Sequence, residues 1–296
     1  MKGAVCFMQG LDDIVKSYAE ETISPAGIVY SKLSCNNAQL VVSQLSCTLK
    51  DVELAAMSNG IIPERYERSL GTVGGVEGQI RLLKSRAAVV GLGGLGGLAS
   101  ELLARMGVGT LILIDGDTIS ESNLNRQVLA TEENIGESKA EAARKRIKQV
   151  NAVVETVPFK EMADRENICG MLRGCHVALD CLDNLQTRFL LQEACRELGI
   201  PLVHGAIVQF YGQLSTIFPG DPGFKAIYKS YEIGKDKGIE RELGNPSATP
   251  ALVSAWQVQE AIKILLNIKE LLRNRLLFID TLHGSTEVIK LVRNDD

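Results

Sequence analysis

Short apolar runs and helix-like patterns alternate along the chain from residue 86 onward. The runs at 87–90, 110–114, 153–157, 176–180 and 201–204 predict strands, and the segments 95–106, 138–150 and 185–198 predict helices. The run TLILI at 110–114 contains only β-branched and apolar residues, as a strand buried on both faces of a parallel sheet requires. Alternating strands and helices predict the α/β fold class: a doubly wound, Rossmann-like, mostly parallel sheet that binds ligands at the carboxyl ends of its strands.

The pattern changes after residue 211. GQLSTIF at 212–218 predicts an antiparallel strand, and residues 219–247 are rich in glycine, proline and charge, which predicts a crossover loop. A long, mostly apolar helix is expected at 249–266, with a proline in its first turn. Two short strands are expected at 276–280 and 287–292. We therefore expect an antiparallel C-terminal extension of the sheet.

Residues 1–60 form a small N-terminal segment with a different pattern. LDDIVKSYAEE and TLKDVELAAM look helical, whereas AQLVVSQLSC is compatible with a strand. No function follows from these residues, and an appended module and a dimer-facing extension fit equally well. We therefore divide the chain into an N-terminal extension, 1–60, and a second domain, 61–296.

Composition narrows the class of protein. The chain has 296 residues, 45% of them hydrophobic, and a net charge of −4 with both signs mixed, which describes a soluble globular protein and argues against a nucleic-acid partner. The N-terminus makes a poor signal peptide, and no apolar stretch approaches the ~18 residues of a membrane span. The seven cysteines form no CxxC pair, so we expect reduced thiols in the cytoplasm. The even spacing of Cys169, Cys175 and Cys181 is not expected to mark a metal site.

A glycine-rich loop follows the first predicted strand of the sheet, in RAAVVGLGGLGGLAS. Gly91, Gly93 and Gly96 satisfy G-x-G-x-x-G between a strand and a helix, where the backbone approaches phosphate and the helix N-terminus faces negative charge. Asp115 ends the next strand, near the distance expected for a contact to a ribose hydroxyl. These features serve NAD and ATP equally.

The stretch DGDTISESNLNRQ at 115–127 favours a triphosphate over a nicotinamide. A nicotinamide ring needs an apolar shelf, whereas a polar, cationic cluster suits phosphate oxygens. The cluster comprises Asp117, Asn123, Arg126 and Gln127, with Lys139 opening the next helix as a further point charge. A solvated loop beside a cofactor and an NAD-dependent oxidoreductase remain alternatives.

A third polar block, DCLDNLQTR at 180–188, follows another buried strand. Asp180 and Asp183 are both expected at the carboxyl edge of the sheet, where a carboxylate is suited to holding Mg²⁺ against phosphates. Asp183 and Asn184 could instead cap the following helix, and the two roles do not exclude each other.

From Pro63 to Arg293 the chain resembles the ubiquitin-activating-enzyme-like family, in its bacterial MoeB/ThiF/HesA branch. The resemblance rests on the blocks above together with PERYERSLGTVGGVEGQIRLLKSRAAVVGLGGLG, IGESKAEAA, PLVHGAIVQFYGQLSTIF and AWQVQEAIKIL in the same order. It implies an adenylyltransferase that uses MgATP to activate the C-terminal glycine carboxylate of a small ubiquitin-like sulfur-carrier protein ending in Gly-Gly. The implied pathways are molybdopterin or tungstopterin synthesis and thiamin synthesis.

The resemblance also implies roles for residues at matching positions. The nucleotide loop corresponds to Gly91, Gly93, Gly94, Leu95 and Gly96. The residues that match the ribose and triphosphate contacts are Asp115, Asp117, Asn123, Arg126, Gln127 and Lys139. The catalytic segment associated with Mg²⁺ corresponds to Asp183 and Asn184. Arg68 resembles an arginine that reaches into the partner's ATP site across a homodimer. The local sequence around Arg68 would otherwise predict only an exposed helix-face arginine.

Two departures from the family pattern concern cysteine. The crossover loop and the C-terminal tail contain none, so we expect neither the structural zinc of many relatives nor a thioester formed by that loop. Cys181 is expected to be a small buried hydrophobe. Activation of a small-molecule or tRNA carboxylate and a catalytically idle partner subunit remain alternative functions.

Overall fold

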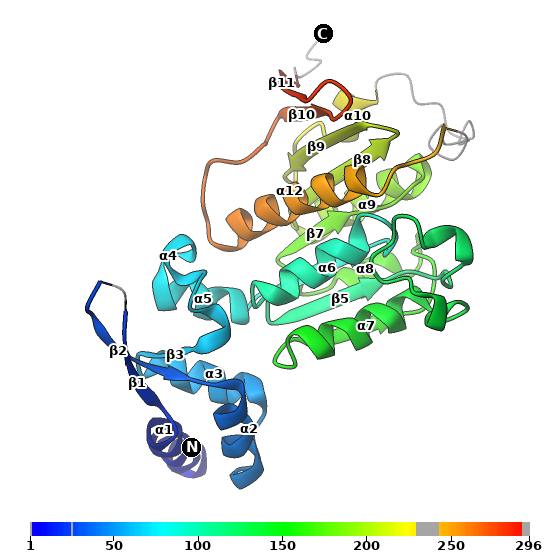
Figure 1. Cartoon of the computed structure of the whole chain (residues 1–296). Coiled ribbons are helices and arrows are strands. Elements are labelled where there is room, and N and C mark those ends of the chain that lie inside the picture. The colour runs from blue at the N-terminus through cyan, green and yellow to red at the C-terminus, as the bar shows by residue number, and fades with distance from the viewer. Residues whose placement is uncertain (1, 25, 229–242, 292–296) are drawn as a thin grey trace.

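The computed structural model describes residues 2–24, 26–228 and 243–291, with the side chains described from residue 10 onward. Figure 1 shows an N-terminal module that lies beside a larger α/β domain. Among the described residues, no helix is long and apolar enough to span a membrane.

An eight-stranded sheet forms the centre of the larger domain. Its strands are β4 (Arg86–Val90), β5 (Thr110–Ile114), β6 (Glu155–Phe159), β7 (Val177–Asp180), β8 (Leu202–Val208), β9 (Tyr211–Ile217), β10 (Arg275–Asp280) and β11 (Ser285–Lys290). The spatial order is β11-β10-β9-β8-β7-β4-β5-β6. Strands β6, β5, β4, β7 and β8 run parallel, whereas β9, β10 and β11 pair antiparallel. This confirms the predicted doubly wound sheet with an antiparallel extension.

Helices cover both faces of the sheet (Figure 1). One face packs against α6 (Gly96–Arg105), α7 (Lys139–Val150) and α12 (Ala248–Leu265), and the other against α8 (Ile168–Leu172), α9 (Leu185–Leu198) and α10 (Phe224–Ile227). Alternate residues of β4 serve the two cores: Ala87 and Val89 join the first, Ala88 and Val90 the second. The strands are therefore buried on both sides, which explains their continuous apolar runs.

The direction of winding reverses between β4 and β7. The chain leaves β4 through α6 for β5 on one side, whereas β7 pairs with β4 on the other side. In an open α/β sheet, this reversal leaves a crevice at the carboxyl ends of the strands. Gly91, Asp115 and Cys181 directly follow β4, β5 and β7, so the fold brings the three polar blocks of the sequence to one edge.

The N-terminal module has its own small sheet and core. It comprises α1 (Lys2–Ser17), β1 (Glu20–Ile23), β2 (Val29–Leu33), α2 (Cys35–Gln44), α3 (Leu49–Ser58) and β3 (Ile61–Pro63). β2 pairs antiparallel with β1 and parallel with β3. Its buried apolar side chains are Leu11, Val15, Leu33, Ala38, Val41, Val52, Ala56 and Ile61.

Two expectations for this module were wrong. The segment 38–47 is not a strand, because α2 occupies most of it: Ser34 caps the helix by accepting a hydrogen bond from the Asn37 N–H, and Ala38 and Val41 bury one face. The expected helix at 11–21 ends at Ser17, and Glu20 begins β1. Pairing of β1 with β2, a contact that local periodicity does not report, ends the helix early.

A small junction of apolar and polar contacts joins the module to the α/β domain. Met57 packs with Leu83 and Val153 in a small apolar cluster. Beside it, Arg65 Nε lies 2.9 Å from Glu53 Oε1, and Arg65 Nη1 donates to Asn151 Oδ1 at 2.6 Å. The short elements η1 (Glu64–Tyr66), α4 (Leu70–Val73) and α5 (Gly75–Leu83) lead from the junction into β4.

Several observed boundaries differ modestly from the predicted ones. The third strand begins at Glu155 instead of 153, and β8 extends to Val208 because it forms a hairpin with β9. Two further turns, η2 (Glu121–Asn123) and η3 (Glu132–Asn134), lie between β5 and α7. The predicted crossover loop, 219–247, contains the short helix α10. Its residues 229–242 lie outside the described residues, as does the expected strand end at 292.

Candidate functional site

A cavity of about 360 Å³ opens where the winding of the sheet reverses. The predicted site residues that line it are Gly91, Gly93, Gly94, Leu95, Asp115, Asp117, Arg126, Gln127, Lys139, Asp183 and Asn184. They come from three segments that are far apart in sequence but follow neighbouring strands. The fold therefore places nearly all of the proposed nucleotide residues around one space, whose size suits a small ligand.

Two glycines of the loop meet strict steric demands. Gly91 has φ of +87°, and a Cβ there would lie 2.6 Å from the carbonyl oxygen of Cys181. A Cβ on Gly96 would lie 1.8 Å from the Gly91 carbonyl oxygen, so Gly96 allows α6 to pack closely on the loop. Leu95 is the N-cap of α6 and provides no side-chain cap. The Gly97 N–H donates to the Gly93 carbonyl at 3.0 Å, and no side chain caps the start of α6, which is the kind of helix terminus that can receive an anion.

Asp115 holds the loops on either side of it. Its Oδ2 accepts a hydrogen bond from the Leu92 N–H at 2.7 Å, and its Oδ1 accepts one from the Asp117 N–H at 2.8 Å. Burial raises the pKa of Asp115 above its ordinary value. Each carboxylate oxygen has a second lone pair, so the group can still accept a hydroxyl hydrogen bond from a ligand.

The cationic side of the cavity combines a buried lysine with a more exposed arginine. Lys139 is 7% exposed, and its Nζ lies 2.8 Å from Asp117 Oδ2. Arg126 donates to the Ser122 carbonyl at 3.1 Å and to Asn125 Oδ1 at 2.9 Å. Both cations are held in place by oxygen acceptors that a phosphate group can replace or supplement.

In the block after β7, Asp183 and Asn184 were both candidates for capping α9. Asn184 caps α9, because its Oδ1 accepts a hydrogen bond from the Thr187 N–H at 2.8 Å. Asp183 is exposed and lines the cavity. The helix cap therefore belongs to Asn184, and Asp183 is a cavity-lining residue that is not the N-cap of α9.

Three predicted site residues do not line the cavity. Gly96 packs beneath the loop, and Asn123 is 8% exposed with its Oδ1 accepting the Ser120 N–H at 3.2 Å. Arg68 is exposed and lies between η1 and α4, outside the cavity of its own chain.

Sequence reasoning missed other lining residues. Arg188 lies in the block DCLDNLQTR, yet no role was predicted for it from sequence. In the fold it is 2% exposed and lines the cavity. Asn245 also lines the cavity, and its side chain accepts a hydrogen bond from the Gln209 N–H at 3.1 Å. The segment 161–163 closes another side. No local signal marks Asn245 or 161–163, because only tertiary structure brings them to the site.

Cys181 is the cysteine that lines this cavity. It is 8% exposed, and burial raises the pKa of its thiol well above the ordinary range. Its Sγ lies 3.7 Å from Gln257 Oε1. A thiol with a raised pKa is a weak nucleophile, so its environment matches the expected role as a buried hydrophobe.

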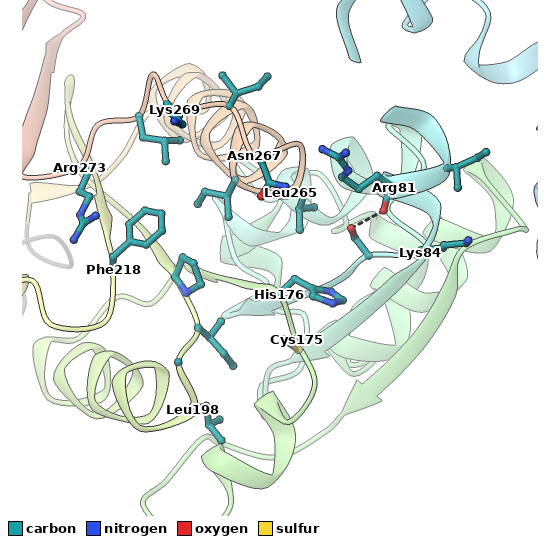
Figure 2. Close-up of a pocket in the computed structure, with 18 of the residues that line it drawn as sticks. Arg81, Lys84, Cys175, His176, Leu198, Phe218, Leu265, Asn267, Lys269 and Arg273 are labelled. Carbon is teal, nitrogen blue, oxygen red and sulfur yellow. Dashed lines mark hydrogen bonds between the residues drawn. The ribbon is translucent and has the colours of Figure 1, made fainter. Parts of the chain in front are cut away.

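A larger cavity, about 1090 Å³, lies at the opposite edge of the sheet (Figure 2). Helices α5, α9 and α12 all present their carboxyl ends to it, and helix carboxyl ends repel anions. Its basic side chains include Arg81, Lys84, His176, Lys269 and Arg273. Arg81 donates to the Leu266 carbonyl at 2.9 Å, which satisfies the end of α12. The three helix carboxyl ends around this cavity disfavour a triphosphate, in contrast to the helix amino end at the smaller cavity.

Comparison with known proteins identifies relatives of this chain. The model of the ThiF family matches residues 66–296. The SAMP-activating enzyme E1 of Haloferax volcanii is 40% identical over 225 residues, which cover 75% of this chain and 82% of that protein. The molybdopterin-synthase adenylyltransferase of Haemophilus influenzae is 35% identical, over 74% of this chain and 90% of its own. The adenylyltransferase and sulfurtransferase MOCS3 of Drosophila yakuba is 38% identical over 77% of this chain, which spans about half of that longer protein.

Solved structures show the same fold. PaaA superposes with a TM-score of 0.65 at 18% identity, over 93% of this chain and 99% of its own. That share cannot be reached without most of residues 1–60. E. coli MccB, in a crystal structure with ATP, has a TM-score of 0.65 at 18% identity and covers 87% of this chain and 83% of its own. The family match and the curated relatives together confirm the expected resemblance: the chain belongs to the ThiF family.

Proposed function

We propose that this protein uses MgATP to adenylate the C-terminal glycine carboxylate of a small ubiquitin-like sulfur-carrier protein. The observation that carries the proposal is the convergence of the glycine loop, Asp115, Arg126, Lys139 and Asp183 on one cavity. Relatives named as a SAMP-activating enzyme and a molybdopterin-synthase adenylyltransferase support the adenylyltransferase class. A carrier for molybdopterin synthesis is the partner that these names favour.

The residues present fit a nucleoside triphosphate. The start of α6, which has no side-chain cap, and the cavity-lining glycine Gly93 suit phosphate oxygens, and Arg126 and Lys139 supply positive charge. Asp115 suits a ribose hydroxyl. Asp183 lines the cavity, which supports assigning it to Mg²⁺, since proteins usually bind this ion through one or two carboxylates together with substrate phosphates. When bound, Mg²⁺ would offset phosphate charge that repels an incoming carboxylate.

The reaction joins two anions, so charge and position determine its rate. A carboxylate oxygen of the carrier attacks the α-phosphorus of ATP, the bond to the β-phosphate oxygen breaks, and acyl-adenylate and pyrophosphate form. The protein supplies little covalent chemistry: Arg126 and Lys139 neutralise phosphate charge, and the glycine loop fixes the nucleotide. The inert environment of Cys181 supports a reaction that ends at the acyl-adenylate.

Carrier-dependent exchange of labelled pyrophosphate into ATP tests the proposal. Purified protein with MgATP and a carrier ending in Gly-Gly should catalyse exchange, and Asp183→Ala should lower kcat by at least ~100-fold because a charge-compensating contact is lost. Asp13→Ala, an exposed change in α1, is the matched control. Exchange at the wild-type rate in Asp183→Ala would remove the site assignment, and tight NADH binding without ATP binding would remove the function.

We further propose a homodimer in which Arg68 completes the partner's site. The exposed position of Arg68, outside its own cavity, supports this arrangement. Mixing inactive Arg68→Ala and Asp183→Ala subunits should restore roughly a quarter of the wild-type activity, because random pairing in a two-fold dimer leaves one intact site in half of the dimers. Mixtures that stay inactive after verified subunit exchange would contradict the shared site.

A further inference from the structure

A fully buried histidine lies behind the cavity and takes no part in the chemistry above. His204, on β8, and Asp180, at the end of β7, are both 0% exposed. His204 Nδ1 lies 2.7 Å from Asp180 Oδ2. On its other side, His204 Nε2 lies 3.2 Å from Tyr228 Oη and 3.2 Å from Gln213 Nε2. A buried polar pair of this kind needs all of its partners in place to be tolerated.

The protonation of this group follows from its partners. Burial lowers the pKa of His204, so the imidazole is neutral at neutral pH. Because Asp180 is an acceptor, the proton sits on Nδ1, and Nε2 accepts from Tyr228 or Gln213. The ring is thereby fixed in one tautomer and one orientation.

The group is connected to the catalytic segment through the backbone of Leu182. Asp180 Oδ1 accepts a hydrogen bond from the Leu182 N–H at 3.1 Å. The guanidinium of Arg188 donates to the Leu182 carbonyl and, at 3.1 Å, to Tyr228 Oη, while its Nε lies 3.6 Å from Asp180 Oδ2. Both backbone polar groups of the residue before Asp183 are thus held by this cluster.

The backbone of Asp180 is fixed as well. Gln257, on α12, donates from Nε2 to the Asp180 carbonyl at 2.8 Å and lies 3.2 Å from the Val203 carbonyl. With the backbone held from one face and the carboxylate held by His204 and Arg188, the turn after β7 has little freedom. Leu182, Asp183 and Arg188 line the cavity, whereas His204 does not.

We propose that His204 is a positioning residue for adenylation: it orients the Asp180 carboxylate, which with Arg188 fixes the Leu182–Asp183 segment against the nucleotide. This inference rests on the proposed function. His204 touches no substrate, and its effect is exerted through Asp180. The glycine loop, Arg126 and Lys139 belong to other segments, so loss of His204 should disturb the reacting geometry more than it disturbs ATP binding.

Two substitutions of His204 separate positioning from folding. His204→Leu removes both ring nitrogens, whereas His204→Asn retains a side-chain N–H near the position of Nδ1 that can donate to Asp180. The measurements are the Kd of ATP by calorimetry, kcat and KM in carrier-dependent pyrophosphate exchange, and Tm. His204→Leu should lower kcat roughly 10–100-fold while the Kd of ATP stays within about threefold, since a misplacement near 1 Å is enough for such a loss. His204→Asn should recover most of kcat.

The chain provides a matched control. His283 lies 2.8 Å from Asp280 Oδ2 through its Nδ1, but this pair is on the surface, and the His283 side chain is 69% exposed. His283→Asn should leave kcat and the Kd of ATP unchanged. Tyr228→Phe is a second probe in case His204→Leu does not fold: it removes the donor to Nε2 and the acceptor for Arg188, and should lower kcat several-fold at nearly unchanged Tm.

The outcomes are distinct. Wild-type kcat in both His204→Leu and Tyr228→Phe would overturn the inference, as would a loss of ATP affinity equal to the loss of kcat, or no recovery in His204→Asn. An inactive wild-type protein with every carrier would instead defeat the proposed function, and the positioning role with it.

Discussion

The charged residues of the candidate nucleotide cavity require partners of opposite charge. Lys139 is nearly buried, and a buried ammonium requires an acceptor. Asp117 supplies this acceptor. The terminal phosphates of ATP would compete with Asp117 for the same ammonium, so Lys139 should distinguish nucleotides by the number of their phosphates.

Replacing Lys139 by glutamine should weaken ATP binding much more than AMP binding. A hydrogen bond to a charged group contributes about 1.5–3 kcal/mol, which corresponds to a loss of roughly 10–100-fold in the Kd of ATP. Calorimetry with ATP and with AMP measures the difference. Lys145→Gln, on the same helix and paired with Glu137 outside the cavity, is the control. Equal losses for both nucleotides would contradict a contact to the terminal phosphates.

Residues that directly follow strands were predictable from sequence, whereas distant contributors were not. Gly91, Asp115 and Asp183 stand just after apolar runs, and parallel topology brings such positions to one edge. Asn245 reaches the cavity from beyond the segment 229–242, so no spacing rule points to it. Arg188 lies inside a helix, where an arginine ordinarily suggests a solvated face.

At the scale of elements, apolar composition gave a wrong prediction for residues 38–47, because local hydrogen bonding determines the structure there. Leu40, Val41 and Val42 make 38–47 resemble a strand, yet the buried side chains are Ala38 and Val41, which are three positions apart as on one helix face. The cap at Ser34 satisfies the start of α2. In the α/β domain the same reasoning succeeded, because strands buried on both faces leave little ambiguity.

The connection between β4 and α6 provides the test at this scale. Gly96→Ala would place a Cβ against the Gly91 carbonyl, so the loop or the helix must move, and ATP binding should be lost at calorimetric concentrations. Gly170→Ala, in α8, meets nothing within 4 Å and should leave ATP binding unchanged while stabilising the fold by about 0.5–1 kcal/mol. Retention of wild-type ATP affinity in Gly96→Ala would show that close helix–loop packing is dispensable.

The described part of the molecule consists of two units, the N-terminal module and the α/β domain, which meet at a small junction. The N-terminal core and the cores on the two faces of the sheet share no buried residues, and Met57, Leu83 and Val153 bridge them. Glu53 lies at this junction, 1% exposed, beside Arg65. Burial raises the pKa of Glu53 to about 7 despite the arginine. The protonation state of one carboxyl therefore influences how the two parts fit.

Stability should depend on pH through this group. Because folding raises the pKa of Glu53, the protonated carboxyl adds stability that is complete below pH 4.5 and is lost as the pH rises through about 7. Relative to Glu53→Gln, the wild-type free energy of unfolding should fall by up to roughly 3 kcal/mol across this range, since one pKa unit is worth about 1.4 kcal/mol. Urea denaturation at several pH values measures this.

Glu64→Gln, which alters a surface pair with Lys32, should preserve the wild-type pH profile. Identical profiles for wild type and Glu53→Gln would refute the assignment to Glu53.

The junction between the N-terminal module and the α/β domain also has a kinetic consequence. A unit with its own core and a small contact area can separate from its neighbour at a free energy below that of global unfolding. Backbone amides of α2 and α3 should then exchange with deuterium through detachment of the module alone. Amides of β4 and β5 should exchange only when the whole α/β domain unfolds. Ionisation of Glu53 would accelerate the first process and leave the second untouched.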